Sequence, residues 1–313
     1  MTPVATVCIS TYNRADRLDR LLSALAAQDV EGFDVVVYDD ASTDGTSDVL
    51  ARWGKELPLT ALRGAVNVGP ASGRNLAWRR AAGRTVLFTD DDCVPCPSWV
   101  RGHLVAAAPD VVSVGRTEPD PAQQGNAGPF SRTLEVHDAS MFQTANVAYP
   151  RALLERLDGF DERFRRAAGE DTELGLRALE SGATAVFLPD ALVHHDVRPS
   201  SVTAALREAT KWTDLPLVAA RHPQAVKGMT HSTLWWRKTH PVALLAVVSL
   251  LGAARRPALL AGVLPWLRLR TGELAPDARR RHWPLVLPAQ LVIDAVEVGT
   301  LARGSVRHRK LLL

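Results

Sequence analysis

Acidic residues follow two apolar runs in the first hundred residues. Asp39-Asp40 follows the run Asp34–Tyr38, and three consecutive aspartates, Asp90–Asp92, follow the run Thr85–Thr89. If the runs are neighbouring strands, the two acidic groups repel each other unless a positive group lies between them. A divalent cation that holds a diphosphate meets this need, because hard cations bind carboxylate and phosphate oxygens together. The pattern therefore predicts metal-assisted chemistry on a diphosphate.

The aspartates after the strands, and an arginine near them, Arg74, also have simpler interpretations. An aspartate after a strand often caps the next turn or helix, which suits Asp44 and Asp40 but explains three consecutive aspartates poorly. Arg74 begins a predicted helix after Gly69-Pro70. Its guanidinium could bind phosphate or a base in a bidentate manner, or it could pair with the Asp39-Asp40 group. Both interpretations place Arg74 in the same cleft.

Further titratable residues lie later in the chain. Asp171 begins another predicted helix, and a helix N-terminus lowers the pKa of an acid and keeps it ionised, as a general base requires. Capping of this helix is the alternative role. His194-His195 follows a strand-like run and a Pro-Asp-Ala turn. An imidazole there could bind metal or phosphate, although such pairs are more often structural.

The cysteines point to a reducing compartment. Cys93 and Cys96 form a CxxC without a second ligand pair, so incidental loop residues are expected rather than a zinc or redox site. The total of three cysteines is odd in a chain too long to need disulfides. Met1–Pro3 leads directly into a strand without the features of a signal peptide. A cytoplasmic protein is therefore expected.

The positions of these residues depend on alternating strands and helices. This alternation predicts a mostly parallel sheet covered on both faces, in which ligands bind at the carboxyl ends of the strands. Strands are expected at Val4–Ser10, Asp34–Tyr38, Leu57–Leu62, Thr85–Thr89, Val111–Gly115, Thr144–Tyr149 and Ala183–Leu188. Helices are expected at Arg14–Gln28, Asp44–Trp53, Ala71–Ala82 and Asp171–Ser181. The loop Pro119–Pro129 is long enough to form a functional flap.

The C-terminal part has a different composition. From Trp235 to Leu313 there are 13 Lys and Arg against four Asp and Glu, whereas residues 1–234 carry 24 against 30. Its apolar stretches are Pro241–Ala254, Pro257–Leu267 and Pro284–Ala302. The first two are shorter than the roughly 20 residues of a membrane span, and the third contains two acids, Asp294 and Glu297. Helices on an anionic membrane surface are therefore expected, with a helical hairpin packed on the protein body as the alternative.

Taken in order, the segments from about residue 4 to residue 200 resemble the family 2 glycosyltransferases of the GT-A fold. The resemblance rests on six segments that occur in one order. They are VCISTYNR at the first strand, YDDASTDGT at the second, GRN at Gly73–Asn75, FTDDDCVP, TANVAY with LDGFDERF at 144–164, and GEDTEL. The resemblance implies a GT-A catalytic domain at residues 1–200 and a helical C-terminal region at 201–313.

It also implies roles for individual residues. The nucleotide pocket would be lined by Ser10, Tyr12 and Arg14, with Asp39 accepting a hydrogen bond from a pyrimidine-type base and Arg74 reinforcing that pocket. Asp90 and Asp92 would form the ends of the DxD motif, with Asp91 facing the ribose. Asp92 would hold Mg²⁺ or Mn²⁺, with Asp90 and His195 as further metal or diphosphate contacts. Asp171 would be the catalytic base beside Glu170, and Asn146, Gly159, Phe160 and Asp161 would border the sugar and acceptor sites.

The expected reaction is an inverting transfer from a nucleoside diphosphate sugar, UDP or dTDP by preference, to an acceptor hydroxyl. The acceptor would be a glycan, a lipid-linked molecule or a small molecule, and nucleic acid is not an expected partner. A retaining double displacement needs a second carboxylate close to the first, and none is evident. A nucleotidyltransferase would show a Gly-rich loop after the first strand, which STYNR is not. A non-catalytic binding or scaffold protein of this fold should lack part of the acid set.

Overall fold

The computed structural model of the chain describes residues 3–131, 133–197, 201–232, 234–273 and 283–313. The chain forms two compact units. The first comprises Met1–Asn126 and Thr133–Arg198, and the second comprises Ala127–Arg132 and Pro199–Leu313. Part of the loop expected at Pro119–Pro129 therefore belongs to the second unit. The boundary expected after residue 200 falls within 198–200, outside the described residues.

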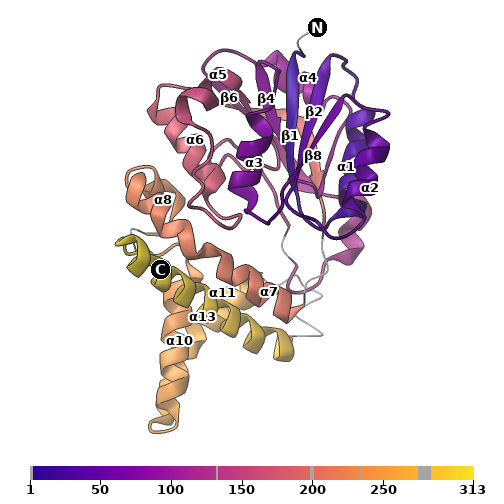
Figure 1. Ribbon diagram of the computed structural model, residues 1–313. Coiled ribbons are helices and arrows are strands. Elements are labelled where there is room, and N and C mark those ends of the chain that lie inside the picture. Colours follow the sequence, from indigo (N-terminus) through magenta and orange to yellow (C-terminus); the bar gives the residue numbers. More distant parts are fainter. Residues whose placement is uncertain (1–2, 132, 198–200, 233, 274–282) are drawn as a thin grey trace. The chain divides into compact units, whose positions relative to one another are not determined.

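The first unit is built on an eight-stranded sheet with the order β3-β2-β1-β4-β7-β6-β8-β5 (Figure 1). Strand β7 is antiparallel to β4 and β6, and β5 is antiparallel to β8, while the other neighbours pair in parallel. All strands except β5 and β7 thus run in one direction, which confirms the predicted mostly parallel sheet. The strands are β1 Ala5–Thr11, β2 Phe33–Asp39, β3 Leu59–Arg63, β4 Thr85–Phe88, β5 Cys93–Pro95, β6 Val111–Pro119, β7 Val147–Pro150 and β8 Thr184–His195.

Helices cover both faces of this sheet. Side chains alternate along β1, so that Val7 and Ile9 pack in one core with the leucines of α1 while Cys8 packs in another core with Trp78 of α3. Helix α1 buries Leu18, Leu21, Leu22 and Leu25, the four residues at helical spacing. Each leucine so buried contributes roughly 1.5–3 kcal/mol. The helices are α1 Ala15–Ala26, α2 Thr46–Trp53, α3 Pro70–Trp78, α4 Trp99–Val105, α5 Arg151–Leu157 and α6 Glu170–Glu180.

Two strands differ from the expectations. The third was expected to be buried, but β3 lies at the edge of the sheet and is partly exposed. The last continues from Thr184 to His195, so the expected Pro-Asp-Ala turn is an irregularity within β8. There Leu188 pairs with Gly115 and Val193 with Thr117, which leaves four residues opposite one. The expected flap contains a 3₁₀ helix, η1, at Pro121–Asn126.

The second unit is helical, as predicted. Its elements are α7 Val202–Ala209, η2 Thr210–Asp214, α8 Leu215–Arg221, α9 Val226–Met229, α10 Thr239–Ala253, η3 Pro257–Val263, α11 Leu264–Glu273 and α13 Trp283–His308. The acids of its third apolar stretch are paired inside this unit. Asp294 accepts a hydrogen bond from Trp266 at 2.8 Å, and Glu297 lies 3.3 Å from His240. Among the described residues, no helix combines the length and apolar character that crossing a membrane requires.

Candidate active site

The carboxyl ends of β1, β2 and β3 meet at one edge of the sheet. In the parallel register Thr11 pairs with Asp39, and Asp39 pairs with Arg63. Strand β4 follows β1 in the sheet and ends just before Asp90–Asp92. The acids expected to lie together are therefore at the same edge, where ligands bind in open α/β sheets.

Asp40 has the structural role that the capping interpretation predicts. Its two carboxylate oxygens accept the backbone N–H groups of Val68 and Gly69, at 2.7 and 2.9 Å. Gly69 has φ of 89°, and an added Cβ would lie 2.8 Å from the carbonyl oxygen of Arg165, so glycine is required there. These contacts fix the start of α3, which carries Arg74. Asp44 likewise accepts N–H groups, from Ala15 and Thr46.

Arg74 joins two acidic segments that are far apart in the sequence. Its guanidinium donates to Asp90 at 2.7 Å and to Glu170 at 2.8 Å, and its side chain is 6% exposed. The ring of Phe160 lies 5.8 Å from the guanidinium carbon. Burial opposes the charge of Arg74, but Asp90 and Glu170 outweigh it and raise the pKa of Arg74. The alternative interpretation, in which Arg74 pairs with the Asp39-Asp40 group, is wrong, because this arginine joins the acids that follow β4 to the start of α6.

Asp171 is next to Glu170 in the first turn of α6. Gly169 is the N-cap of this helix, so capping does not explain Asp171. Burial and the charge of Glu170 raise the pKa of Asp171 to about 7, although the Thr172 N–H and Arg74 act in the opposite direction. The expected lowering by the helix N-terminus is therefore wrong. A carboxylate that titrates near neutrality can accept and release a proton under physiological conditions.

The second and third residues of the aspartate triple contact the end of β1 and the residues that follow it. Asp91 is buried and accepts hydrogen bonds from Thr11 at 2.8 Å and from Arg14. Asp92 is also buried and lies 3.4 Å from both Arg14 and His195. Both oxygens of Asp91 thus have protein partners, and Asp91 holds Arg14 in place. Its expected position facing a ribose stays a prediction.

The residues around Asp92 fit a divalent cation. A carboxylate oxygen of Asp92, the sulfur of Cys93 and a ring nitrogen of His195 all lie within 4.8 Å of one another. Carboxylate and imidazole are ligands that Mn²⁺ accepts, and burial lowers the pKa of His195 and so favours its neutral, ligating form. Burial raises the pKa of the Cys93 thiol, which keeps it a poor ligand for a hard cation. Asp92 and His195 are therefore the stronger ligand candidates.

Cys93 was expected to be an incidental loop residue, but it lies in β5 directly opposite His195 of β8. The pairing of these strands brings His195 to the acids of β4, which sequence spacing does not show. All three cysteines of the chain are free.

Arginines neutralise much of the acidic edge. Arg14 forms ion pairs with Asp91 and Asp92. Arg74 pairs with Asp90, and Arg63 lies 3.1 Å from Asp39. The repulsion that suggested a cation is thus relieved in part by the chain itself. A bound metal is consequently supported by the cluster of Asp92 and His195 and not by the number of acidic residues at this edge.

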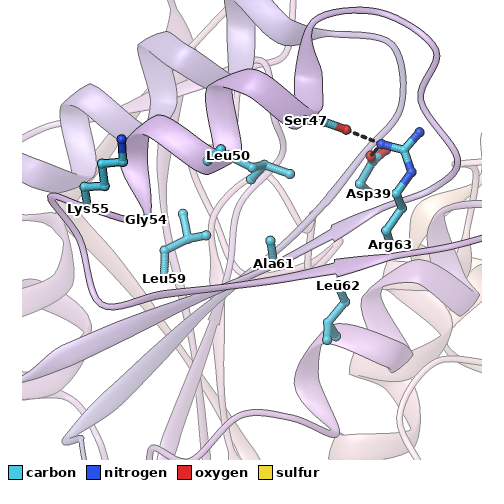
Figure 2. A pocket seen from close by; sticks show the side chains of 10 residues that line it. Asp39, Ser47, Leu50, Gly54, Lys55, Leu59, Ala61, Leu62 and Arg63 are labelled. Atoms are coloured by element: carbon cyan, nitrogen blue, oxygen red, sulfur yellow. Dashed lines mark hydrogen bonds and ion pairs between the residues drawn. The ribbon is translucent and has the colours of Figure 1, made fainter.

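A cavity of about 360 Å³ opens beside Asp39 (Figure 2). The side chain of Asp39 is 1% exposed, and its Oδ1 accepts the Ser42 N–H at 2.8 Å. Its Oδ2 forms the 3.1 Å ion pair with Arg63 but has no well-aligned hydrogen bond. Arg63 projects from the end of β3 toward Asp39 and donates to the carbonyl of Ser42 at 2.7 Å and to Ser47. The cavity is lined by Asp39, Ser47, Leu50, Ala51, Gly54, Lys55, Leu59, Ala61, Leu62 and Arg63.

The sequence analysis did not predict Arg63 as a site residue. Its position could have suggested this role, because it is a basic residue at the end of the third strand, in register with Asp39. The other expected pocket residues lie at the end of β1. Tyr12 is 46% exposed and free to offer its ring face. Ser10 lies under the start of α3, where an added Cβ on Gly73 would come within 2.3 Å of its hydroxyl oxygen.

Asn146 is buried and hydrogen-bonded within the protein. Its Oδ1 accepts from Trp99 at 2.8 Å and lies 2.9 Å from His103, while its Nδ2 donates to the carbonyls of Arg116 and Ala191. The side chain is 1% exposed. All of its side-chain polar atoms are taken by the protein, and its expected place at the border of the sugar and acceptor sites stays a prediction.

The Gly-Phe-Asp segment also has structural contacts. Gly159 has φ of 66°, and an added Cβ would lie 2.4 Å from both Asn75 and Trp78. The backbone of Phe160 exchanges two hydrogen bonds with the side chain of Asn75, at 2.8 and 2.9 Å. Asp161 pairs with Arg163 at 2.9 Å. The segment thus packs against α3 and Arg74, and its expected place at the border of the sugar and acceptor sites stays a prediction.

Two family models match this chain. Glycosyl transferase family 2 matches residues 6–138, and glycosyl transferase family group 2 matches residues 128–293. Validoxylamine A glucosyltransferase of Streptomyces hygroscopicus subsp. jinggangensis is 33% identical over 215 residues, which are 56% of this chain and 51% of that protein. Pre-mycofactocin glycosyltransferase of Mycobacterium tuberculosis is 30% identical over 235 residues, covering 70% of this chain and 48% of that protein. The chain therefore spans about half the length of these curated relatives.

Solved structures share the fold. A mannosyltransferase from Pyrobaculum calidifontis in complex with GDP-Man and Mn²⁺ has a TM-score of 0.62 at 23% identity, covering 99% of this chain and 88% of its own. S. aureus TarS 1–349 in complex with UDP-GlcNAc has a TM-score of 0.55 at 19% identity, covering 98% and 92%. With the motif order, the family matches and this fold in agreement, the chain belongs to glycosyltransferase family 2 and adopts the GT-A fold.

Proposed function

We propose that this chain is an inverting, metal-dependent glycosyltransferase that moves a sugar from a nucleoside diphosphate to an acceptor hydroxyl. The observation that carries the proposal is the ion-pair chain Asp90–Arg74–Glu170. It connects the acids after β4 to the first turn of α6, which supports a role for Asp171 beside the proposed cation and diphosphate site. Membership of the family supports glycosyl transfer, and the geometry supports the assignment of roles.

The donor would bind along the carboxyl ends of β1 and β2. The exposed ring of Tyr12 suits stacking on a base, and the buried Oδ2 of Asp39, although ion-paired with Arg63 at 3.1 Å, lacks a well-aligned hydrogen bond. A uracil or thymine N3–H would supply that bond, and Arg63 could donate to a neighbouring carbonyl of the base. These contacts favour a UDP- or dTDP-sugar. Ser10 and Arg14, on the diphosphate side, would complete the pocket.

Asp92 and His195 would hold Mn²⁺ or Mg²⁺, with Asp90 next to them. A bound cation would supply charge stabilisation for the leaving nucleoside diphosphate. Arg14 is the chain's own contribution to the same task, because its side chain is 34% exposed and lies against Asp91 and Asp92. A fixed guanidinium of this kind stabilises developing charge without reorganisation.

Asp171 would take the proton of the acceptor hydroxyl as that oxygen attacks the anomeric carbon. Its neighbour Glu170 is bound to Arg74 and 2% exposed, so it is not placed to act as a second nucleophile. One displacement inverts the anomeric configuration, whereas retention requires two. Glu170 is therefore a positioning residue that holds Arg74 and tunes Asp171. The acceptor is proposed as a glycan, a lipid-linked molecule or a small molecule.

A donor screen tests this function. The full chain is incubated with UDP-, dTDP- and GDP-sugars, with Mn²⁺ or with a chelator, while thermal stability and released nucleoside diphosphate are measured. We expect one donor class both to stabilise the protein and to be consumed only with metal. Binding without turnover would indicate a non-catalytic protein of this fold, and pyrophosphate release from a nucleoside triphosphate and a sugar phosphate would indicate a nucleotidyltransferase. Either result contradicts the proposal.

A further inference from the structure

The second unit exposes a concentrated apolar surface. Of the 17 exposed large hydrophobic residues in the described part of the chain, eight lie between Leu244 and Leu264. Leu251 is 74% exposed and Leu264 is 61% exposed, values that a water-soluble helix normally reserves for polar side chains. Contiguous apolar surface of this kind marks an interaction site. We call helix α10, the turn 254–256 and η3 the α10–η3 hairpin.

The hairpin is packed with its small residues inside and its large residues outside. Ala243, Ala246 and Ser249 are buried on one side of α10. On the opposite side, Leu244, Val248 and Leu251 recur at the spacing of one helical face and are exposed. A helix that folds only against protein in water would bury its leucines and expose its small residues, so this arrangement is inverted.

Close packing inside the hairpin explains how the arrangement is maintained. An added Cβ on Gly262 would lie 2.1 Å from the hydroxyl oxygen of Ser249, and one on Gly252 would lie 2.5 Å from Leu259. Small residues at these positions let α10 and η3 approach closely, as they do between helices in lipid. The outward leucines are therefore fixed in place.

The charge of the hairpin identifies its partner. Residues 239–272 contain no aspartate or glutamate, and Arg255 and Arg256 occupy the exposed turn at the end of α10 that Figure 1 shows farthest from α13. Helix α10 has 15 residues and is about 22 Å long, which is less than the roughly 30 Å of a hydrocarbon core. We propose that the α10–η3 hairpin lies in the plane of an anionic membrane surface, with its leucine face in one leaflet and its arginines against the headgroups.

This arrangement follows the physics of interfacial helices. Leucine side chains enter the boundary between headgroups and acyl chains, while arginines extend toward phosphate and add electrostatic attraction. The inference does not depend on the transfer reaction. If both proposals hold, sugar transfer takes place next to a membrane, and a lipid-linked acceptor would meet the enzyme at that membrane surface.

Vesicle flotation of the full chain tests the inference. Wild type is compared with Val248→Ser/Leu251→Ser and with the matched control Val306→Ser/Leu311→Ser, which removes two exposed apolar residues of the same unit outside the hairpin. Vesicles contain phosphatidylcholine alone or with phosphatidylglycerol. We expect wild type and control to float with anionic vesicles, and the hairpin variant to lose about tenfold or more in apparent affinity. Arg255→Glu/Arg256→Glu should lose binding to anionic vesicles only.

Three outcomes would overturn the inference. Wild type could fail to float, the hairpin variant could float like wild type, or the hairpin variant could convert a wild-type dimer into a monomer in sedimentation velocity. The last result would show that the leucine face binds a second copy of the chain. Circular dichroism melting confirms that the variants are folded. Donor consumption without vesicles is measured in parallel, so that failure of the membrane inference is distinguishable from failure of the transferase proposal.

Discussion

Replacement of Arg74 is the perturbation with the clearest expected magnitude. Arg74→Met removes the positive partner of Glu170, which is 2% exposed, and of Asp90, whose side chain is 29% exposed. Breaking a buried pair by removing one partner costs about 3–5 kcal/mol. Most of this cost belongs to Glu170, because solvent screens the more exposed Asp90. We therefore expect the free energy of unfolding to fall by about 3 kcal/mol.

Urea unfolding followed by circular dichroism measures this change. The double variant Arg74→Met/Glu170→Gln removes both members of the buried pair and should recover much of the lost stability. It should not recover donor consumption, because the bridge between β4 and α6 stays broken. An Arg74→Met variant as stable as wild type, or a further loss of stability on adding Glu170→Gln, would contradict a stabilising Arg74–Glu170 pair.

Three more predictions follow from the site. The rate constant kcat/KM should rise with pH through about 7, because Asp171 must be deprotonated to act as a base. Glu170→Gln should move this rise to lower pH, because it removes a charge that raises the pKa of Asp171. The pH–rate profiles of both proteins check this, and an unchanged profile in the variant contradicts it. Arg63→Gln should weaken nucleoside diphosphate binding about tenfold in calorimetry, whereas Arg52→Gln, an exposed arginine on α2, should not. Asn146→Leu leaves several buried polar groups unpaired and should cost about 2–5 kcal/mol in unfolding experiments, a loss that a direct sugar contact would not produce.

The sequence predicted those parts of the site that depend on chain order alone. Apolar runs ending in Asp39 and Asp90–Asp92 indicated strands whose carboxyl ends share one edge, and the structure places them there. The helix that begins at Glu170 was also predicted to within one residue. These features follow from local periodicity and from the rule that parallel strands align.

The parts that could not be predicted depend on contacts between distant segments. The partners of Arg74 are Asp90 and Glu170 because α6 packs near β4, and nothing near Arg74 in the chain indicates this. The pKa of Asp171 is raised because burial and Glu170 outweigh the helix N-terminus, a balance that depends on the surrounding fold. Asn146 occupies a buried position between β6, β8 and α4, where its amide satisfies four partners.

The central claim is that Asp171 and Asp92 carry metal-dependent sugar transfer. Its most direct test is the amount of glycosylated acceptor and released nucleoside diphosphate formed with the donor that the screen selects, in Mn²⁺, by wild type, Asp171→Asn, Asp92→Asn and the exposed control Asp48→Asn. Loss of a general base alone costs about 10²–10⁴-fold in rate. We predict at least that loss for Asp171→Asn and Asp92→Asn, and a wild-type rate for Asp48→Asn. Transfer by Asp171→Asn at the wild-type rate would contradict the account.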